Sequence, residues 1–293
     1  MKPVLLPSLR VMAVQYEVLG GQSLASFMLR VEDSVKQAVL ERASLLVLPE
    51  LHSLDLIAKV PESDASQLRS IAERYFESYR DGVESLSKKY GISILAGTFP
   101  RPVDQGVRNT AILSLADGRS FLQDKLFLTP DEKLWGWSPG DVLNIIETPW
   151  GPTAILICFD SEIPALTHKL VKEAPDLVLV PSMTGPTGFY RVRWSAKSRA
   201  IEHHVPVIHS GTVGGTRGRK EFFGSAAIIL PQDTPYPRGL AAESLADKPG
   251  WVIFDLPLEL IRARRLEFDT VHPAREERER TAPISIERIK SLG

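Results

Sequence analysis

Cys158 is the residue whose type and position most clearly suggest chemistry, and it is the only cysteine among the 293 residues. It ends the apolar run that begins at Thr153, and Pro164, which suits the first turn of a helix, follows it closely. A thiol at a strand-to-helix turn lies at a sheet edge, where the N-terminus of the next helix stabilises a thiolate. This position is typical of a nucleophile. The alternative is a buried cysteine that only packs.

A cysteine nucleophile needs a base and a group that holds the developing oxyanion. The clustered His203, His204 and His209 lack the spacing of a zinc protease, and we expect structural or surface roles for them. Glu50 follows a buried strand, where α/β folds place ligands, although a helix cap or salt bridge is its alternative. Lys125 also follows a strand and offers three donors to an oxyanion. The alternative for Lys125 is a side chain that extends to solvent.

The elements that must position these residues follow from the hydrophobic periodicity. Apolar runs bounded by turn residues alternate with helical patterns, and a hairpin turns at Asp117-Gly118. This order predicts an α/β fold with a mixed sheet. Strands are expected at residues 9–16, 44–48, 92–96, 109–115, 119–124, 153–158, 177–180, 205–209, 222–230 and 251–255, and helices at residues 24–42, 66–90, 164–173 and 191–203.

The domain organisation is expected to be simple, because no linker interrupts the alternation. We predict one domain over residues 1–265 and a charged C-terminal extension over residues 266–293. A mixed-sign charge run of this kind is usually a solvated tail or helix face. Three isoleucines follow it, Ile284, Ile286 and Ile289. They allow the extension to dock on the body or on a partner subunit.

Composition narrows the possible partners and the compartment. The 35 basic and 36 acidic side chains leave a net charge of −1, so no global charge favours nucleic acid or an anionic membrane. Pro3, Pro7 and Arg10 interrupt the N-terminal apolar run, which argues against a secretory leader. No stretch nears the roughly 18 apolar residues of a membrane span. We therefore expect a cytoplasmic protein without nucleic-acid or membrane partners.

Three segments together resemble the signature blocks of the nitrilase superfamily of carbon–nitrogen hydrolases. Each block alone is weak evidence, whereas their order and spacing are specific. The likeness continues across nearly the whole chain, from the opening strand at Val11 to the closing strand at Trp251. The three blocks are Leu48-Pro49-Glu50, Asp124-Lys125-Leu126 with Pro130 and Glu132 following, and Ile157-Cys158-Phe159-Asp160.

The resemblance implies a four-layer α-β-β-α sandwich that dimerises through its helical faces. It also implies a catalytic triad of Glu50, Lys125 and Cys158, with Glu132 as a second glutamate that orients Lys125 or a substrate group. We expect no cofactor and no metal. The residues expected to contact substrate are Phe159, Glu162, Ser182 and Met183.

The activity implied is hydrolysis of a small amide through a thioester. Glu50 would take the thiol proton, and Cys158 would attack the carbonyl carbon. The Lys125 ammonium and the Phe159 backbone N–H would hold the oxyanion. Water activated by the same carboxylate would then release the acid.

Departures from the family pattern bear on the substrate. Phe159-Asp160 replaces the Trp-Glu pair common in members that hydrolyse nitriles, and this favours amides. Glu162 stands where many relatives carry arginine. Its side chain either faces a cationic end of the substrate or stabilises the helix N-terminus.

A glycine-rich segment at residues 211–218 lacks the Gly-Lys-Ser/Thr ending of a phosphate-binding loop, so we expect a loop there. The resemblance implies that it lies near the pocket. The basic residues within and directly after this segment would face either solvent or an acidic substrate. They are Arg217, Arg219 and Lys220.

Two other functions stay open at this point. One is a nitrilase that converts a nitrile to an acid and ammonia. The other is a catalytically silent dimer that serves as a binding or scaffold protein, against which the complete set of reacting groups argues.

Overall fold

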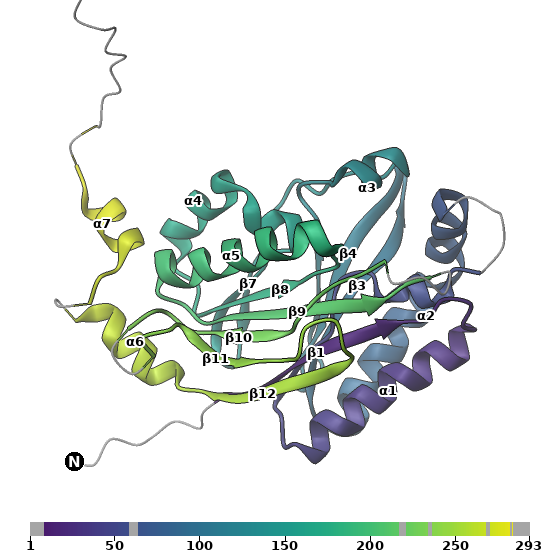
Figure 1. Cartoon of the computed structure of the whole chain (residues 1–293), viewed down its shortest axis with the longest axis horizontal. Coiled ribbons are helices and arrows are strands. Elements are labelled where there is room, and N and C mark those ends of the chain that lie inside the picture. The colour runs from purple at the N-terminus through teal and green to yellow at the C-terminus, as the bar shows by residue number, and fades with distance from the viewer. Residues whose placement is uncertain are drawn as a thin grey trace, which may run out of the picture.

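The computed structural model describes residues 9–58, 64–216, 221–233, 236–267, 270–281 and 283. Their order confirms the predicted alternation of strands and helices (Figure 1). In chain order the elements are β1 (Leu9–Val18), α1 (Leu24–Leu40), β2 (Leu45–Val47), the 3₁₀ helix η1 (His52–Leu56), α2 (Asp64–Tyr90), β3 (Ser93–Val103), β4 (Gly106–Ser114), β5 (Ser120–Asp124), α3 (Pro130–Leu134), β6 (Ile145–Thr148), β7 (Gly151–Ile155), the 3₁₀ helix η2 (Cys158–Glu162), α4 (Pro164–Glu173), β8 (Leu177–Pro181), α5 (Pro186–His203), β9 (Val207–Gly214), β10 (Ala227–Ile229), β11 (Leu240–Glu243), β12 (Gly250–Leu256), α6 (Leu258–Leu266) and α7 (Pro273–Glu279).

The strands form two sheets that are joined where β1 meets β9. The strand order is β5-β4-β3-β2-β1-β9-β8-β7-β6. β12 pairs antiparallel with β1, and β10 pairs antiparallel with β9 and with β11. β1, β2 and β3 are mutually parallel, as are β7, β8 and β9. β4 pairs antiparallel with β3 and with β5, and β6 pairs antiparallel with β7. The sheets are therefore mixed, as the sequence predicts.

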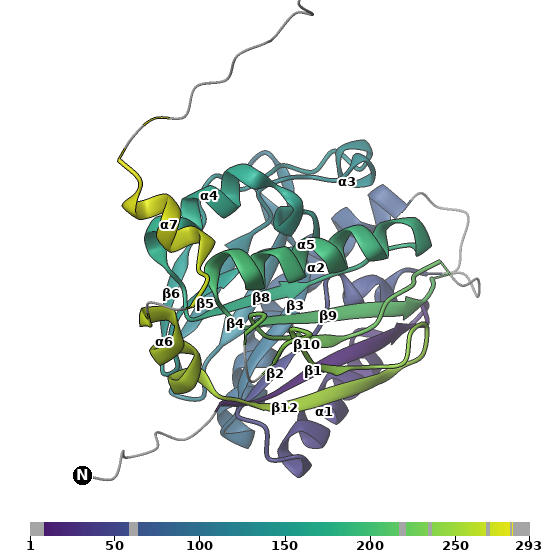
Figure 2. The ribbon, with the colours of Figure 1, turned by 60° about the vertical axis from the view of Figure 1, so that its left-hand side comes forward.

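The two faces of β1 show how the layers are built. Val11 and Ala13 belong to the apolar core that includes the second sheet, whereas Met12 and Val14 belong to the core beneath α1 and α2. Successive side chains of a strand point to opposite faces, so the apolar stretch Val11-Met12-Ala13-Val14 serves both cores. Figures 1 and 2 show α1 and α2 on one side of the sheets and α4 and α5 on the other. This is the α-β-β-α sandwich that was predicted.

The C-terminal elements pack on the same chain. α7 contacts α4 and α5, and Arg278 Nη1 donates 2.8 Å to the carbonyl oxygen of Val171. Glu277 Oε1 lies 2.5 Å from Nδ1 of His168 on α4. The described part of the extension over residues 266–293 thus docks on its own body. Its isoleucines lie outside the described residues.

Several strand bounds differ from the prediction. The strand expected at residues 153–158 ends at Ile155, and the one expected at 222–230 is only Ala227–Ile229. The prediction of a loop from residue 211 is wrong over residues 211–214, because β9 continues there in parallel pairing with the end of β1. Local glycine content does not reveal such a distant partner. The basic residues at positions 217, 219 and 220 lie outside the described residues.

None of the described helices combines the length and the apolar character that crossing a bilayer requires.

Candidate active site

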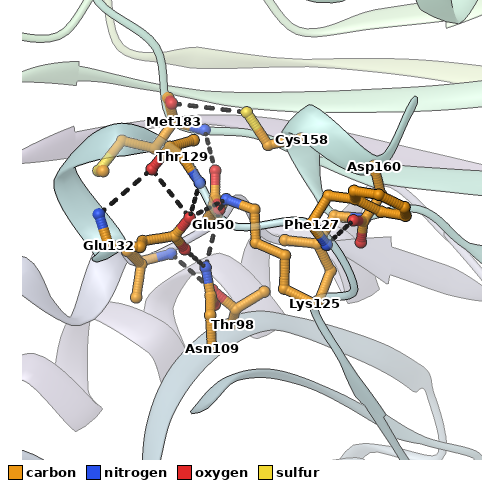
Figure 3. Close-up of polar contacts among 12 residues, drawn as sticks. Glu50, Thr98, Asn109, Lys125, Phe127, Thr129, Glu132, Cys158, Asp160 and Met183 are labelled. Atoms are coloured by element: carbon orange, nitrogen blue, oxygen red, sulfur yellow. Dashed lines mark hydrogen bonds and ion pairs between the residues drawn. The ribbon is translucent and has the colours of Figure 1, made fainter. Parts of the chain in front are cut away.

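Three strand ends bring the expected triad together. Glu50 follows β2, Lys125 follows β5 and Cys158 opens η2 after β7. All three side chains are buried and line one pocket. In Figure 3 the amine of Lys125 points at Glu50, and the sulfur of Cys158 points toward Met183. The convergence joins residues that are 75 positions apart in one hydrogen bond, from Lys125 Nζ to Glu50 Oε1 at 2.7 Å.

The turn that carries Glu50 is shaped by a bulge in β3. Gly97 has a φ of +61°, and a Cβ there would lie 1.9 Å from the carbonyl oxygen of Pro49. Only glycine allows this close backbone approach. The next residue, Thr98, accepts a hydrogen bond from the Leu51 N–H at 2.9 Å. The β3 bulge therefore holds the backbone on both sides of Glu50.

Glu132 places a second carboxylate against Lys125. Its Oε2 lies 2.8 Å from Lys125 Nζ, and the backbone N–H and hydroxyl of Thr129 donate to the same oxygen at 2.8 and 2.9 Å. Thr129 and Glu132 form a capping box at the start of α3, which fixes the rotamer of Glu132. The short helix thus positions the residue that was expected to orient Lys125.

Asn109 is a residue of the site that our sequence reasoning missed. Its Nδ2 donates 2.8 Å to Glu50 Oε1 and 2.7 Å to Glu132 Oε1. Its carbonyl oxygen accepts from the Lys125 N–H at 2.8 Å. Asparagine is depleted in strands, so its place at the start of the strand expected at residues 109–115 was a usable signal.

The backbone of Cys158 is in the left-handed region, with a φ of +47°. Such a conformation costs a non-glycine residue of order 1–3 kcal/mol and is concentrated at functional sites. It turns the thiol out of the strand direction. Sγ lies 3.6 Å from the carbonyl oxygen of Met183, whose N–H donates 2.9 Å to Glu50 Oε2. Met183 therefore connects the thiol and the carboxylate through its backbone.

Burial determines the protonation of Cys158 in the free site. Burial, and then the negative charge of Glu50, raise the pKa of the Cys158 thiol well above its usual value. Whereas a helix N-terminus was expected to stabilise a thiolate, burial favours the protonated thiol in the free site. The thiol is neutral and requires a base.

The charges of Glu50 and Lys125 depend on each other. Burial raises the pKa of Glu50, and Lys125 opposes that shift. Burial lowers the pKa of Lys125, but Glu50 and Glu132 outweigh it, so the net shift is upward. Lys125 is therefore a permanent cation, whereas Glu50 is a carboxylate with increased proton affinity, which suits a base.

Asp160 ties the lysine turn to the cysteine turn. Its carboxylate accepts from the backbone N–H groups of Phe127 at 2.8 Å, Leu126 at 3.1 Å and Ile157 at 3.3 Å. Burial raises its pKa to about 7, although Lys125 and these N–H groups oppose the shift. Asp160 is a positioning residue because it fixes both turns.

The pocket has a volume of about 220 Å³. Among the residues expected to contact substrate, Phe159, Glu162 and Met183 line it. Ser182 is buried outside this lining, and its N–H donates 3.0 Å to the carbonyl oxygen of Ser210 on β9. Within the described parts of the chain, no three His, Cys, Asp or Glu side chains are grouped to hold a metal ion.

Known proteins resemble this chain in sequence. The sequence profile of carbon–nitrogen hydrolases matches residues 10–264. Over 262 residues the chain is 30% identical to "Probable hydrolase YhcX" of Bacillus subtilis (strain 168), a match that covers 87% of this chain and 51% of that protein. The chain thus spans about half the length of this relative. It is 24% identical over 276 residues to a deaminated glutathione amidase of Synechocystis, covering 89% of this chain and 96% of that one.

Solved structures share the fold. An amidase from Nesterenkonia has a TM-score of 0.73 at 20% identity, covering 90% of this chain and 97% of that one. Nit3 of Saccharomyces cerevisiae, a member of branch 10 of the nitrilase superfamily, has a TM-score of 0.73 at 22% identity, covering 90% and 95%. Sequence profile, relatives and fold agree, and the chain belongs to the carbon–nitrogen hydrolase family.

Proposed function

We propose that this carbon–nitrogen hydrolase cleaves a small amide to an acid and ammonia or an amine, through a thioester on Cys158. The observation that carries the proposal is the pair of hydrogen bonds that the two carboxylate oxygens of Glu50 accept from Lys125 and Met183. One carboxylate oxygen accepts from Lys125 at 2.7 Å, and the other accepts from Met183, whose carbonyl oxygen lies 3.6 Å from the Cys158 sulfur. One base thus stands beside both the nucleophile and the cation.

The first half-reaction forms the thioester. Glu50 takes the thiol proton as Cys158 Sγ bonds to the carbonyl carbon, and negative charge develops on the carbonyl oxygen. Two N–H groups of Lys125 are directed to Glu50 and Glu132, which leaves its third donor for that oxygen. The backbone N–H of Phe159, the residue next to Cys158, supplies a second donor to the same oxygen. The carbon–nitrogen bond then breaks, and Glu50 returns its proton to the leaving nitrogen.

The second half-reaction releases the acid. Glu50, again ionised, takes a proton from water as the water oxygen attacks the thioester carbon. The carbon–sulfur bond breaks, and the proton returns to the sulfur. Both half-reactions require the same carboxylate, and each positioned proton transfer contributes about 10²–10⁴ in rate.

One observation supports a small substrate, and another supports an amide substrate. The pocket volume of about 220 Å³ is below the roughly 300–1,000 Å³ of sites for drug-sized ligands. Curated relatives that are 23–24% identical to parts of this chain are named as amidases, among them a deaminated glutathione amidase and an omega-amidase.

Ammonia release tests the proposal. The full chain is incubated with ω-amides, N-carbamoyl compounds, aliphatic amides and nitriles, with Cys158→Ala as the blank, and the intact mass of the protein is measured during turnover. We expect ammonia from one of the amide classes and an acyl adduct on Cys158. Ammonia from nitriles alone would favour a nitrilase. No turnover, together with iodoacetamide labelling of Cys158 no faster than that of a free cysteine peptide, would favour a scaffold protein.

We also propose that the chain forms a homodimer through a helical face. α5 exposes Tyr190 and Trp194, whose rings stack with centroids 6.5 Å apart and are 56% and 59% exposed. Exposed apolar patches of this kind mark interaction surfaces. Light scattering of the full chain should give twice the monomer mass, and Trp194→Glu should lower it to the monomer mass. A monomer before substitution would contradict the proposal.

A further inference from the structure

The outer part of the pocket is formed by a second pair of opposite charges. Glu162 ends η2 and Arg191 lies on α5, and both line the pocket that contains Cys158. Arg191 Nε donates to Glu162 Oε2. The Glu162 side chain is 8% exposed and that of Arg191 is 63% exposed, so a solvent-facing arginine covers a buried carboxylate.

The other oxygen of Glu162 is left unsatisfied. Oε1 is buried and has no hydrogen-bond partner among the residues that the structure describes. A buried carboxylate oxygen without a donor is costly, because desolvation removes its water and nothing replaces it. A ligand group that brings N–H donors to this wall of the pocket would satisfy it.

The outer part of the pocket has a negative net charge. Asp131 lines it together with Glu162, and Arg191 is the opposing cation, since Lys125 lies between Glu50 and Glu132. The rings of Trp135 and Phe159 also contribute to the lining, and aromatic faces attract cations. Both features favour a positively charged ligand group over a negatively charged one.

We propose that Glu162 binds an ammonium or guanidinium group at the end of the substrate remote from the scissile amide, and that Arg191 occupies this carboxylate until the substrate displaces it. The inference rests on the proposed amide hydrolysis and names its substrate class, a cationic amide. Glu162 is four residues beyond Cys158 in a 3₁₀ helix, a rise of about 8 Å at 2.0 Å per residue. A cation separated from the amide by a short aliphatic chain spans that distance.

A substrate cation can displace Arg191 from Glu162 more easily than a substrate anion can bind to Arg191. An ion pair with one solvent-exposed partner contributes little net free energy, so a substrate cation can replace it. A substrate carboxylate bound to Arg191 would instead approach Asp131 and Glu162. Like charges at such distances disfavour binding.

Three amides of one length test the charge preference. The full chain is assayed with 5-aminopentanamide, neutral pentanamide and anionic glutaramate, and kcat/KM is determined for each. We expect 5-aminopentanamide to exceed pentanamide by about tenfold or more and glutaramate to be the poorest, as a hydrogen bond to a charged group predicts. Equal rates for the three, or a preference for glutaramate, would overturn the inference.

Variants assign the preference to its residue. Glu162→Gln should lower the ratio of kcat/KM for 5-aminopentanamide to that for pentanamide by about tenfold, whereas Arg191→Gln should keep or raise this ratio. Glu84→Gln, on the remote helix α2, is the matched control and should leave the ratio unchanged. A ratio that is insensitive to Glu162→Gln would overturn the inference. So would a preference for glutaramate that disappears in Arg191→Gln.

Binding to an inactive variant separates this inference from the proposed function. Calorimetry on Cys158→Ala should show tighter binding of 5-aminopentanamide than of pentanamide, and adding Glu162→Gln should remove the difference. If wild type cleaves no amide but this difference is observed, amide hydrolysis fails and the cation site stands. If wild type cleaves all three amides without charge preference and the calorimetric difference is absent, the cation site fails and amide hydrolysis stands.

Discussion

The inner and outer parts of the pocket hold their carboxylates in opposite ways. Glu50 is held by Lys125, Asn109 and the Met183 N–H, all from the protein interior. Glu162 has one exposed arginine on one oxygen, and its other oxygen has no donor among the described residues. The chain itself completes the reacting groups, whereas the outer carboxylate is left for an exchangeable partner. On the two proposals made above, the inner part of the pocket would carry out the chemistry and the outer part would select the substrate.

Burial explains why the two parts differ. A buried charge must be paired within the fold, because removing one partner leaves an uncompensated charge. A pair with a solvent-exposed member gains little, because water and salt screen it. The inner groups should therefore control both rate and stability, and the outer groups mainly selectivity.

Replacing Glu50 by glutamine should reduce turnover most. Both half-reactions lose their base, and each should slow by about 10²–10⁴. Because acylation and deacylation slow together, the fraction of the chain that carries an acyl adduct on Cys158 should not rise above that of the wild type. Rapid-quench kinetics with intact-mass detection measures both steps. An adduct fraction above that of the wild type would show that another group activates the thiol.

Lys125→Met should lower both activity and stability. Loss of the cation leaves Glu50 and Glu132 buried without their common partner, which costs about 3–5 kcal/mol of unfolding free energy. Loss of an oxyanion donor should reduce kcat by about 10²–10³. Urea unfolding and amide turnover provide the two measurements. Unchanged stability would mean that the inner carboxylates are already protonated in the wild-type chain.

The Asp160 carboxyl should make stability depend on pH. Because burial raises its pKa to about 7, the folded chain keeps this proton between about pH 4 and 7 while the unfolded chain has released it. Its contribution to stability is complete below about pH 4 and is lost as the pH rises to 7. Asp160→Asn should flatten the fall in unfolding free energy over this interval, measured by urea titrations at pH 5 and pH 8. An identical slope in wild type and variant would contradict the assignment.

Arg191→Gln should have the smallest effect on stability. The pair with Glu162 has one solvent-exposed member, which water and salt screen, and we expect it to contribute at most about 1 kcal/mol to the unfolding free energy. Lys125→Met, measured in the same urea series, is the matched comparison from the inner pair. A loss of similar size in both variants would remove the proposed distinction between the two parts of the pocket.

Much of the site could be anticipated because three sequence blocks resemble those of carbon–nitrogen hydrolases. Positions near the ends of expected strands made Glu50, Lys125 and Cys158 candidates, and the order and spacing of the blocks selected them as a set. Asn109 and Gly97 were missed, since their roles depend on what lies opposite them. Asn109 bridges two carboxylates that are 82 positions apart in sequence, and Gly97 makes room for Pro49.

The sequence by itself determined the alternation of strands and helices, the apolar faces and the types of the reacting groups, because these depend on local periodicity and side-chain chemistry. Tertiary structure alone decided the protonation of Cys158, the continuation of β9 along β1 and the pairing of Glu162 with Arg191. Each of these depends on burial or on a contact between distant segments, and neither is encoded in the neighbouring residues.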